Sequence, residues 1–229
     1  MNTYKAVVSG MTVLLAGCVL PLSVSVDADG SDSNGIRGSG HPVTVSRVVR
    51  DFQRIEVSGV GRVVLQRTGR ERLRITADDN LLEYIESEVL DGTLFIRPAK
   101  GVNLDPVTEL VFDVEAATIQ AIGGSGAVGF EVDLDDQPEL LVTLSGACAL
   151  PARGVVDRLD LVLSGATAYR GLDLQTRTAR VFTSGVAWAE VFVWERLDAY
   201  ASGVSWIRYA GNPETVNAFV SGVSSIGPY

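Results

Sequence analysis

Few residues in this sequence have the types that catalysis or metal binding needs. The 229 residues contain one histidine, His41, and two cysteines, Cys18 and Cys148. A zinc site made of clustered cysteine and histidine ligands cannot be assembled from three such residues. A Ser-His-Asp triad would have to use His41, which lies in a Gly/Ser-rich stretch and is interpreted as a bystander. We therefore assign no catalytic residue, no metal site and no cofactor.

A small group of carboxylates is the remaining candidate for enzymatic chemistry. Asp133, Asp135 and Asp136 lie shortly before Pro138, and paired carboxylates in a groove are what many polysaccharide hydrolases use. The same residues are typical of a polar loop, which is the interpretation that we favour. The formal net charge of −9 lacks the basic footprint of a nucleic-acid-binding protein, so nucleic acid is excluded as a partner.

The N-terminus has the pattern of a targeting signal. Lys5 precedes the mostly apolar residues 6–17, which are too few to span a bilayer as a helix, since a span needs about 20. They are typical of a secretory signal peptide. The run Leu15-Ala16-Gly17-Cys18 resembles a bacterial lipobox, in which cleavage precedes the cysteine and palmitate-type chains acylate it. The alternative is an ordinary signal peptide with an incidental cysteine.

This resemblance implies a location and a domain order. We expect residues 1–17 to be a lipoprotein signal peptide and Cys18 to be the lipid anchor in the membrane of a bacterial cell envelope. Val19 is not the aspartate that retains some lipoproteins at the inner membrane, so the outer membrane is favoured. Residues 18–45 are acidic and Gly/Ser-rich, a composition that predicts a lipidated flexible tether.

From residue 46 to residue 229 the sequence predicts β-strands. Leu73 and Ile75 alternate with polar neighbours, as in a half-buried strand. Asp91-Gly92 separates two apolar runs and indicates a tight hairpin turn. Residues 78–85 leave room for one short helical turn at most.

An internal repeat dominates the second half. Ser-Gly followed by Ala or Val recurs six times, at intervals of 18 to 20 residues. The pairs are Ser125-Gly126, Ser145-Gly146, Ser164-Gly165, Ser184-Gly185, Ser202-Gly203 and Ser221-Gly222. Apolar residues alternate before each pair, so one parity should face inward. The pattern predicts an all-β parallel β-solenoid of about 19-residue coils, with each glycine at a tight corner and each serine bonding across stacked corners.

The repeat resembles a known family of bacterial domains. The repeated Ser-Gly-Ala/Val, the lead-in from Arg50 to Val57 and the run from Asp91 to Ile96 are similar to the GIN domain, named as the head of auto-transporter adhesins. The resemblance covers residues 46–229 and implies a right-handed β-helix-like fold, with no catalytic residues to carry over. The first copy reads Gly123-Gly124-Ser125 without an apolar lead-in, so we expect an irregular coil there.

The repeat register also predicts a surface and a buried thiol. Two places before the serine, three successive copies carry Phe182, Tyr200 and Phe219, which should stack about 4.8 Å apart. Trp188 and Trp206 follow the corners and should stack likewise. These aromatics are a candidate contact surface for a protein partner, a glycan or another copy of the chain, as in a homo-oligomer. The alternative is that the tryptophans fill the core. Cys148, three places after Ser145, should be buried and inert.

The sequence thus favours a non-catalytic envelope lipoprotein that presents its repeats for adhesion or binding. An envelope-stress or scaffold component is the first alternative, because binding and scaffold roles have the same sequence features. A polysaccharide-active enzyme built on a β-helix is the second, less favoured alternative.

Overall fold

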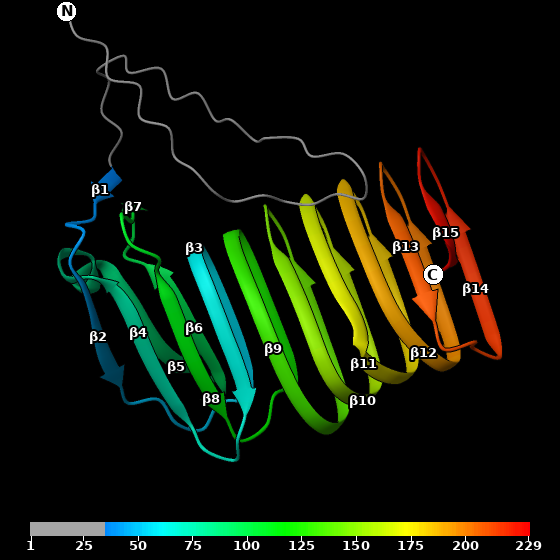
Figure 1. Cartoon of the computed structure of the whole chain (residues 1–229), viewed down its shortest axis with the longest axis horizontal. Helices are drawn as coiled ribbons and strands as arrows, with labels where there is room; N and C mark the ends of the chain where they lie inside the picture. The colour runs from blue at the N-terminus through cyan, green and yellow to red at the C-terminus, as the bar shows by residue number, and fades with distance from the viewer. Residues whose placement is uncertain (1–34) are drawn as a thin grey trace, which may run out of the picture. The chain divides into compact units, whose positions relative to one another are not determined.

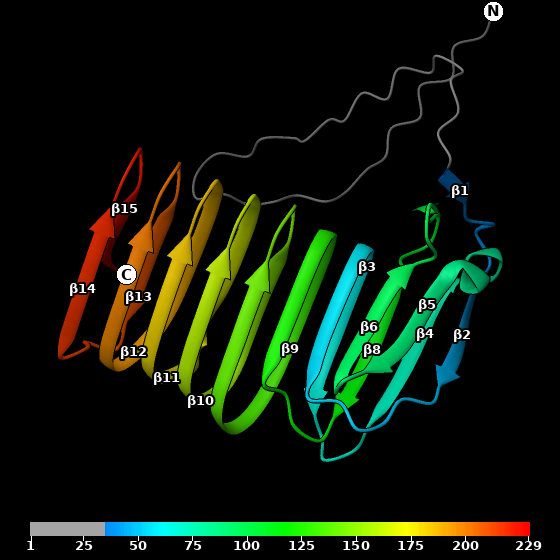
Figure 2. The same ribbon diagram turned by 180° about the vertical axis from the view of Figure 1, so that it is seen from behind.

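The computed structural model describes residues 35–229, and this part of the chain is all-β apart from one 3-10 turn. A 13-stranded, mostly parallel sheet contains nearly all of its strands. Figures 1 and 2 show the long strands side by side in one row. No helix in residues 35–229 is both long and apolar enough to cross a membrane.

The row is built from the repeats seen in the sequence. Its strands are β9 (Ala121–Leu144), β10 (Ala149–Leu163), β11 (Ala166–Thr183), β12 (Val186–Ala201), β13 (Trp206–Ala210), β14 (Thr215–Val220) and β15 (Ser225–Pro228). Neighbouring strands pair in parallel, as in Thr143 with Val162 and Val162 with Phe182. The pairing offset therefore equals the sequence period, and each repeat lies directly on the next.

The opposite end of the row has a different construction. Its elements are β1 (Gly35–Arg37), β2 (Pro42–Arg47), β3 (Arg54–Arg67), β4 (Arg72–Asp78), η1 (Asp79–Tyr84), β5 (Ile85–Leu90), β6 (Thr93–Pro98), β7 (Asn103–Asp105) and β8 (Val111–Ala116). Strands β2, β4 and β8 pair in antiparallel order, and β8 then pairs in parallel with β3. Strand β3 joins this end to β9. Antiparallel strands thus close the N-terminal end of the parallel row.

The predicted local elements of this end are confirmed. Strands β5 and β6 form an antiparallel hairpin whose turn has positive φ at Asp91 (47°) and Gly92 (72°). Such values are those of a tight primed turn, which Asp-Gly favours. The short helical turn is η1, and it contains one buried residue, Leu81.

Each Ser-Gly pair forms a corner where two backbones approach closely. All six repeat glycines have φ between 72° and 85°, a region that favours glycine. A Cβ on Gly165 would lie 2.6 Å from the carbonyl oxygen of Gly146 in the repeat before it. That oxygen accepts a hydrogen bond of 2.7 Å from the Ala166 N–H. A methyl group would therefore push apart the backbones that this bond joins.

The serines bond across the corners, as expected, although not to one another. The Ser202 hydroxyl donates to the Thr183 carbonyl oxygen at 3.2 Å, and the hydroxyls of Ser145, Ser164 and Ser184 make equivalent bonds of 3.4 Å. The acceptor in each case is a backbone carbonyl just before the preceding corner. These serines therefore help to hold the repeats together.

The inward parity is confirmed by burial. The positions five, three and one before the serine point into the row, and their side chains are at most 3% exposed in the four repeats that end at Ser145, Ser164, Ser184 and Ser202. Examples are Leu159, Leu161 and Leu163, and then Leu197, Ala199 and Ala201. The hydrophobic core is a set of such columns, continuous from repeat to repeat.

Two sequence expectations about the first repeats need correction. The coil around Ser125 is not irregular at its lead-in, since β9 pairs with β3 without a break from Arg54 with Ala121 to Gln66 with Asp133. Gly124 fits because a Cβ there would lie 2.6 Å from the Phe130 ring. Ser58 pairs with Ser125, which makes Ser58-Gly59 an additional copy of the corner.

The tether was expected to extend to residue 45, yet the folded part begins earlier. Strand β2 pairs with β4 from Pro42 to Arg47. Just before it, the buried Asp78 carboxylate accepts a hydrogen bond of 3.0 Å from the Gly40 N–H and one of 2.9 Å from the Val107 N–H. Burial by itself raises the pKa of Asp78, but these bonds and those from Thr108 hold it below its ordinary value. The signal peptide, Cys18 and residues up to 34 lie outside the described residues.

The corner geometry predicts a large difference between two glycine substitutions. Gly165→Ala should lower the free energy of unfolding by about 2 kcal/mol or more, because it combines a positive φ with a backbone clash. Gly129→Ala is the matched control, since no atom lies within 4 Å of its Cβ position and its loss of chain entropy should be slightly favourable. Chemical denaturation measures both, and equal stability of the two variants would contradict the proposed role of the corner.

Candidate functional site

Three aromatic rings form a stack on the outside of the last repeats. The rings of Phe182 and Tyr200 have centroids 4.7 Å apart and an interplanar angle of 8°. Tyr200 and Phe219 follow at 5.0 Å and 6°. Strand register brings them together, since Phe182 pairs with Tyr200 and Tyr200 with Phe219. We call these three residues the aromatic ladder, and its predicted stacking is confirmed.

The aromatic ladder lies along a shallow groove. Its exposed fractions are 39% for Phe182, 37% for Tyr200 and 58% for Phe219. The groove has a volume of about 320 Å³, and Val162 and the corner serines of three repeats, Ser184, Ser202 and Ser221, also line it. Ladder and corners thus form one surface that crosses four neighbouring strands.

The stack determines which part of each ring a ligand can touch. The rings are nearly parallel, so both faces of Tyr200 are covered by its neighbours. A ligand would meet ring edges along the groove, while Phe219 has one face stacked on Tyr200 and is the most exposed of the three. The exposed ring edges are hydrophobic and can meet another aromatic ring edge to face.

A polar column runs beside the aromatic ladder, two residues earlier on each strand. Asp198 accepts hydrogen bonds from Arg196 at 3.0 Å and from Asn217 at 2.7 Å. The bond from Arg196, followed by that from Asn217, lowers the pKa of the Asp198 carboxyl below its ordinary value. Two repeats back, Arg158 binds Asp160 at 2.7 Å. These ion pairs lie beside the aromatic ladder, and in each pair the charge of the carboxylate is compensated by an arginine.

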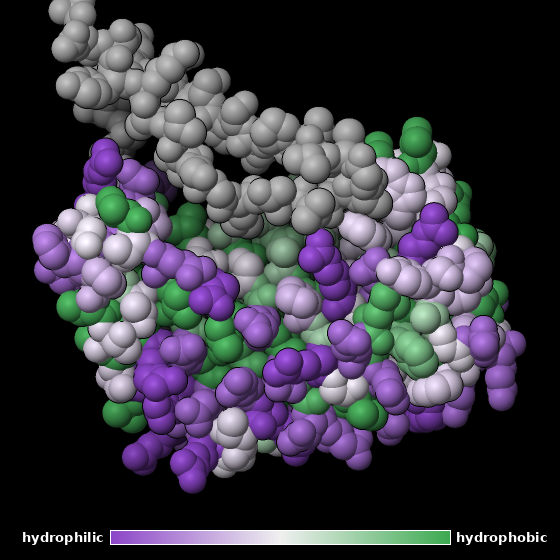
Figure 3. Space-filling view, viewed as in Figure 1, coloured by the Kyte–Doolittle hydropathy of each residue, from purple (hydrophilic) through white to green (hydrophobic). Residues whose placement is uncertain are grey.

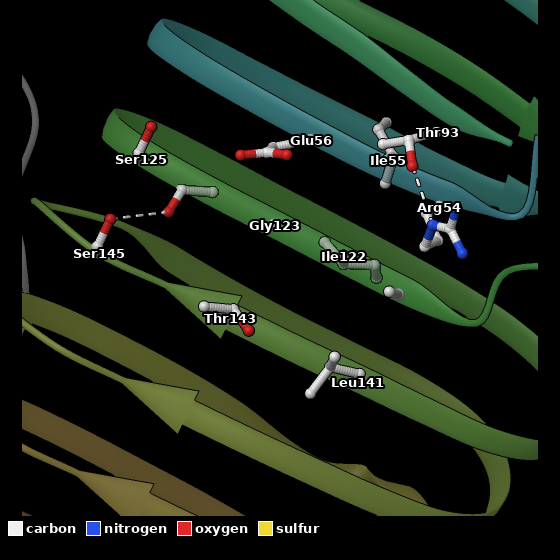
Figure 4. Close-up of a pocket in the computed structure, with 12 residues that line it drawn as sticks. Arg54, Ile55, Glu56, Thr93, Ile122, Gly123, Ser125, Leu141, Thr143 and Ser145 are labelled. Atoms are coloured by element: carbon white, nitrogen blue, oxygen red, sulfur yellow. Dashed lines mark hydrogen bonds between the residues drawn. The ribbon is translucent and has the colours of Figure 1, made fainter. Parts of the chain in front are cut away.

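A second hollow lies on the same face, nearer the N-terminal end (Figure 4). Its volume is about 390 Å³, and Gly123, which occupies the outward column, has no side chain to fill it. Arg54 and Glu56 lie along its upper border in Figure 4. The Arg54 Nε donates to Thr93 at 2.9 Å. Sequence reasoning missed this hollow, although the Gly123-Gly124 pair was its signal.

Trp188 and Trp206 lie outside the groove of the aromatic ladder. Trp188 and Trp206 pair by register on β12 and β13, and Trp206 is 37% exposed between the buried Ser205 and Ile207. Both face outward, so the alternative that they fill the core is wrong. They follow the corner while the aromatic ladder precedes it, and neither lines the groove. The five aromatics therefore do not form a single surface.

Hydrophobic side chains on the face shown in Figure 3 are interspersed with hydrophilic ones rather than gathered in one large area.

The sequence does not predict a second aromatic contact, in which Phe192 and Trp194 meet edge to face with ring centroids 4.8 Å apart. Trp194 is half exposed. The ladder differs from this pair because its rings come from three successive repeats.

Cys148 and Asp133, two residues whose side chains are capable of catalysis, make hydrogen bonds or ion pairs within the fold. Cys148 is buried, as predicted, and its Sγ donates to the Ser145 carbonyl oxygen at 3.0 Å. Burial raises the pKa of this thiol. Asp133 forms an ion pair of 2.7 Å with Arg153, which is not the arrangement of a free catalytic carboxylate. Within residues 35–229 no three potential ligand side chains cluster as a metal site would require.

Residues 51–213 match the family model described as "Putative auto-transporter adhesin, head GIN domain". The chain belongs to this family. The GIN-domain fold is also seen in solved structures. A crystal structure described as a putative adhesin from Bacteroides fragilis has a TM-score of 0.68 and 22% identity, covering 85% of this chain and 100% of that one.

Two more distant structures have the same coverage of this chain. One is described as a putative lipid binding protein from Parabacteroides distasonis, with a TM-score of 0.50, 21% identity and 99% of that chain covered. The other is described as a putative adhesin from Parabacteroides merdae, with a TM-score of 0.50, 16% identity and 99% covered. No curated protein matches the chain. At these identities the structures show a shared fold.

Outward-facing tryptophans predict a small stability effect in the GIN domain. The double variant Trp188→Ala, Trp206→Ala should lose about 1 kcal/mol or less per ring, because both rings remain in contact with solvent. Ile207→Ala is the control: its side chain is fully buried and its truncation should cost about 2–5 kcal/mol. Thermal or denaturant unfolding measures the difference. A larger loss of stability in the double variant than in Ile207→Ala would show that the two rings belong to the core.

Proposed function

We propose that this GIN-domain protein is a non-catalytic adhesion or binding protein of the bacterial envelope. In this proposal Cys18 carries the lipid anchor, favoured in the outer membrane, and residues 18–34 link it to the folded part. The stacked repeats form a right-handed β-solenoid that presents the binding surface. Membership of an adhesin-head family and the lipobox-like run before Cys18 support this assignment.

The aromatic ladder with its groove is the proposed contact surface. The observation that carries the proposal is the exposed stack of Phe182, Tyr200 and Phe219 along a groove of about 320 Å³. Large aromatic side chains are enriched where proteins bind one another. Because the stack presents ring edges, we propose a protein partner with an apolar segment rather than a glycan.

The flanking charges suit such a partner. Asp198 is compensated by Arg196, and Asp160 by Arg158, so the rim offers hydrogen bonds without a strong field of one sign. Interfaces of this kind have an apolar centre and a polar rim. The repeats keep both columns in register, so the surface is rigid before the partner arrives.

The anchor is tested by a cysteine substitution in cells. Cys18→Ala should remove acylation, so the chain should leave the membrane fraction or remain as the uncleaved precursor. The control is Cys148→Ala, which changes the other cysteine and should stay with the membranes. Fractionation and the mass of the N-terminal peptide measure the outcome. A Cys18→Ala chain that is still processed and membrane-bound would refute the lipid anchor.

The contact surface is tested by site-specific photocrosslinking in the producing cells. A photoreactive residue at Val162, in the groove, should give a covalent adduct larger than the chain itself. The matched control is Val155, which lies on the same strand β10 with a similar exposure, 44% against 39%. Tyr200→Glu should abolish the adduct at Val162, because a charge in an apolar contact must be desolvated.

Three results would contradict the proposed surface. Equal adducts from Val155 and Val162 would show contact without a preferred face, and an adduct that survives Tyr200→Glu would exclude the aromatic ladder. Saturable binding of a glycan, lost in Tyr200→Glu, would replace the protein partner by a sugar. Turnover of that glycan would point instead to an enzyme.

A further inference from the structure

Among residues 35–229, no strand covers the C-terminal end of the row. We call residues 215–229, which contain β14 and β15, the terminal repeat. Its inward positions are exposed, at 37% for Val216 and 50% for Val220, and Ala218 is exposed as well. One repeat earlier the equivalent Leu197, Ala199 and Ala201 are at most 3% exposed. The core columns thus end in apolar side chains that face solvent.

The backbone of this end is also open. Strand β14 pairs with β12 on one side and, among residues 35–229, with no strand on the other. An unpaired edge is a template for another strand, and proteins usually protect it with charges, proline, a bulge or a cover. Within Thr215–Val220 there is no charged residue and no proline. At the N-terminal end the edge strand is β2, which pairs only with β4 among residues 35–229 and, in contrast to β14, contains Pro42 and Arg47.

The distribution of charge favours a second copy of the chain as the partner of the terminal repeat. The whole chain has a net charge of −9, yet residues 215–229 contain no Asp, Glu, Lys, Arg or His. Two copies that meet at most other places would bring carboxylates together, whereas two terminal repeats meet without like charges opposite each other. The free side of Phe219 lies at this end too, because its ring stacks only on Tyr200.

We infer that two copies of the chain associate through their terminal repeats, end to end. The partner end is another C-terminal end, since the edge strand at the N-terminal end, β2, contains Pro42 and Arg47, which protect an edge against further pairing. A contact of one surface with itself is isologous and gives a closed two-fold dimer rather than a filament. In the dimer the apolar columns of the two copies meet, and β14 of one copy gains backbone partners from the other. This inference does not depend on the lipid anchor, and it shares Phe219 and Val220 with the groove.

The dimer is tested with the full chain in a detergent of matched density, where sedimentation equilibrium reports the protein mass alone. The wild-type chain should reach twice the monomer mass as concentration rises. Val220→Lys places a charge on the open edge of each copy, so it should weaken association by about tenfold or more. Val155→Lys adds the same charge at a similarly exposed position in β10 and should leave the dimer unchanged.

A crosslinking measurement gives an independent readout in the membrane. Asn217→Cys, near the middle of β14, should yield a covalent dimer with a short bis-maleimide, while Val155→Cys should not. Cys148 is buried and serves as the internal unreactive thiol. A covalent dimer of Asn217→Cys, together with a Val220→Lys chain that sediments with the monomer mass, supports the inference.

Two results would overturn it. One is a wild-type chain that stays monomeric at the highest concentration, with no crosslink at Asn217. The other is a dimer that persists unchanged in Val220→Lys, which would place the contact elsewhere. Val220 also lines the groove, so the two proposals are separated by what each experiment detects: the dimer by the mass of two copies of the chain, and the groove by an adduct of Val162 with a different protein that Tyr200→Glu removes.

Discussion

The close approach of backbones at the Ser-Gly corners is the constraint on which the rest of the structure depends. At each corner the glycine carbonyl of one repeat accepts the N–H that follows the next glycine, at 2.7–2.8 Å. A side chain at these glycines would separate the two backbones. Because the corners hold successive repeats at one spacing, equivalent residues fall into columns, and the columns become core, polar rim or aromatic ladder according to their side chains.

The same regularity explains both the binding surface and its chemistry. Apolar residues fill the inward columns, so an outward column can vary without loss of core packing. Phe182, Tyr200 and Phe219 occupy one outward column and stack because the repeats set their separation. Stacking makes the ladder rigid but covers ring faces, which favours a protein partner. Gly123 interrupts this column and leaves a hollow instead.

A row of parallel repeats has two ends, and in this GIN domain the two ends differ in strand direction and in the residues at their edges. Antiparallel strands form the N-terminal end, where the edge strand β2 contains Pro42 and Arg47, and the buried Asp78 binds the segment around Gly40. The terminal repeat has uncharged residues, exposed core positions and an open edge. Growth of the row by a second copy is therefore restricted to one end, and the groove near that end would come close to its counterpart in a dimer.

The sequence by itself determined the period, the inward and outward columns, the glycine corners, the buried Cys148 and the ladder of Phe182, Tyr200 and Phe219. These features follow from spacing alone, because each repeat copies the backbone of the one before it. Only the tertiary structure decided the features that join distant segments. Residues 35–37 became a strand through pairing with β7 and residues 42–45 through pairing with β4, and Ser58-Gly59 became a corner through pairing with β9. The core positions of the terminal repeat stay exposed because no described strand covers them, and the periodic pattern, which is the same in every repeat, does not contain that information.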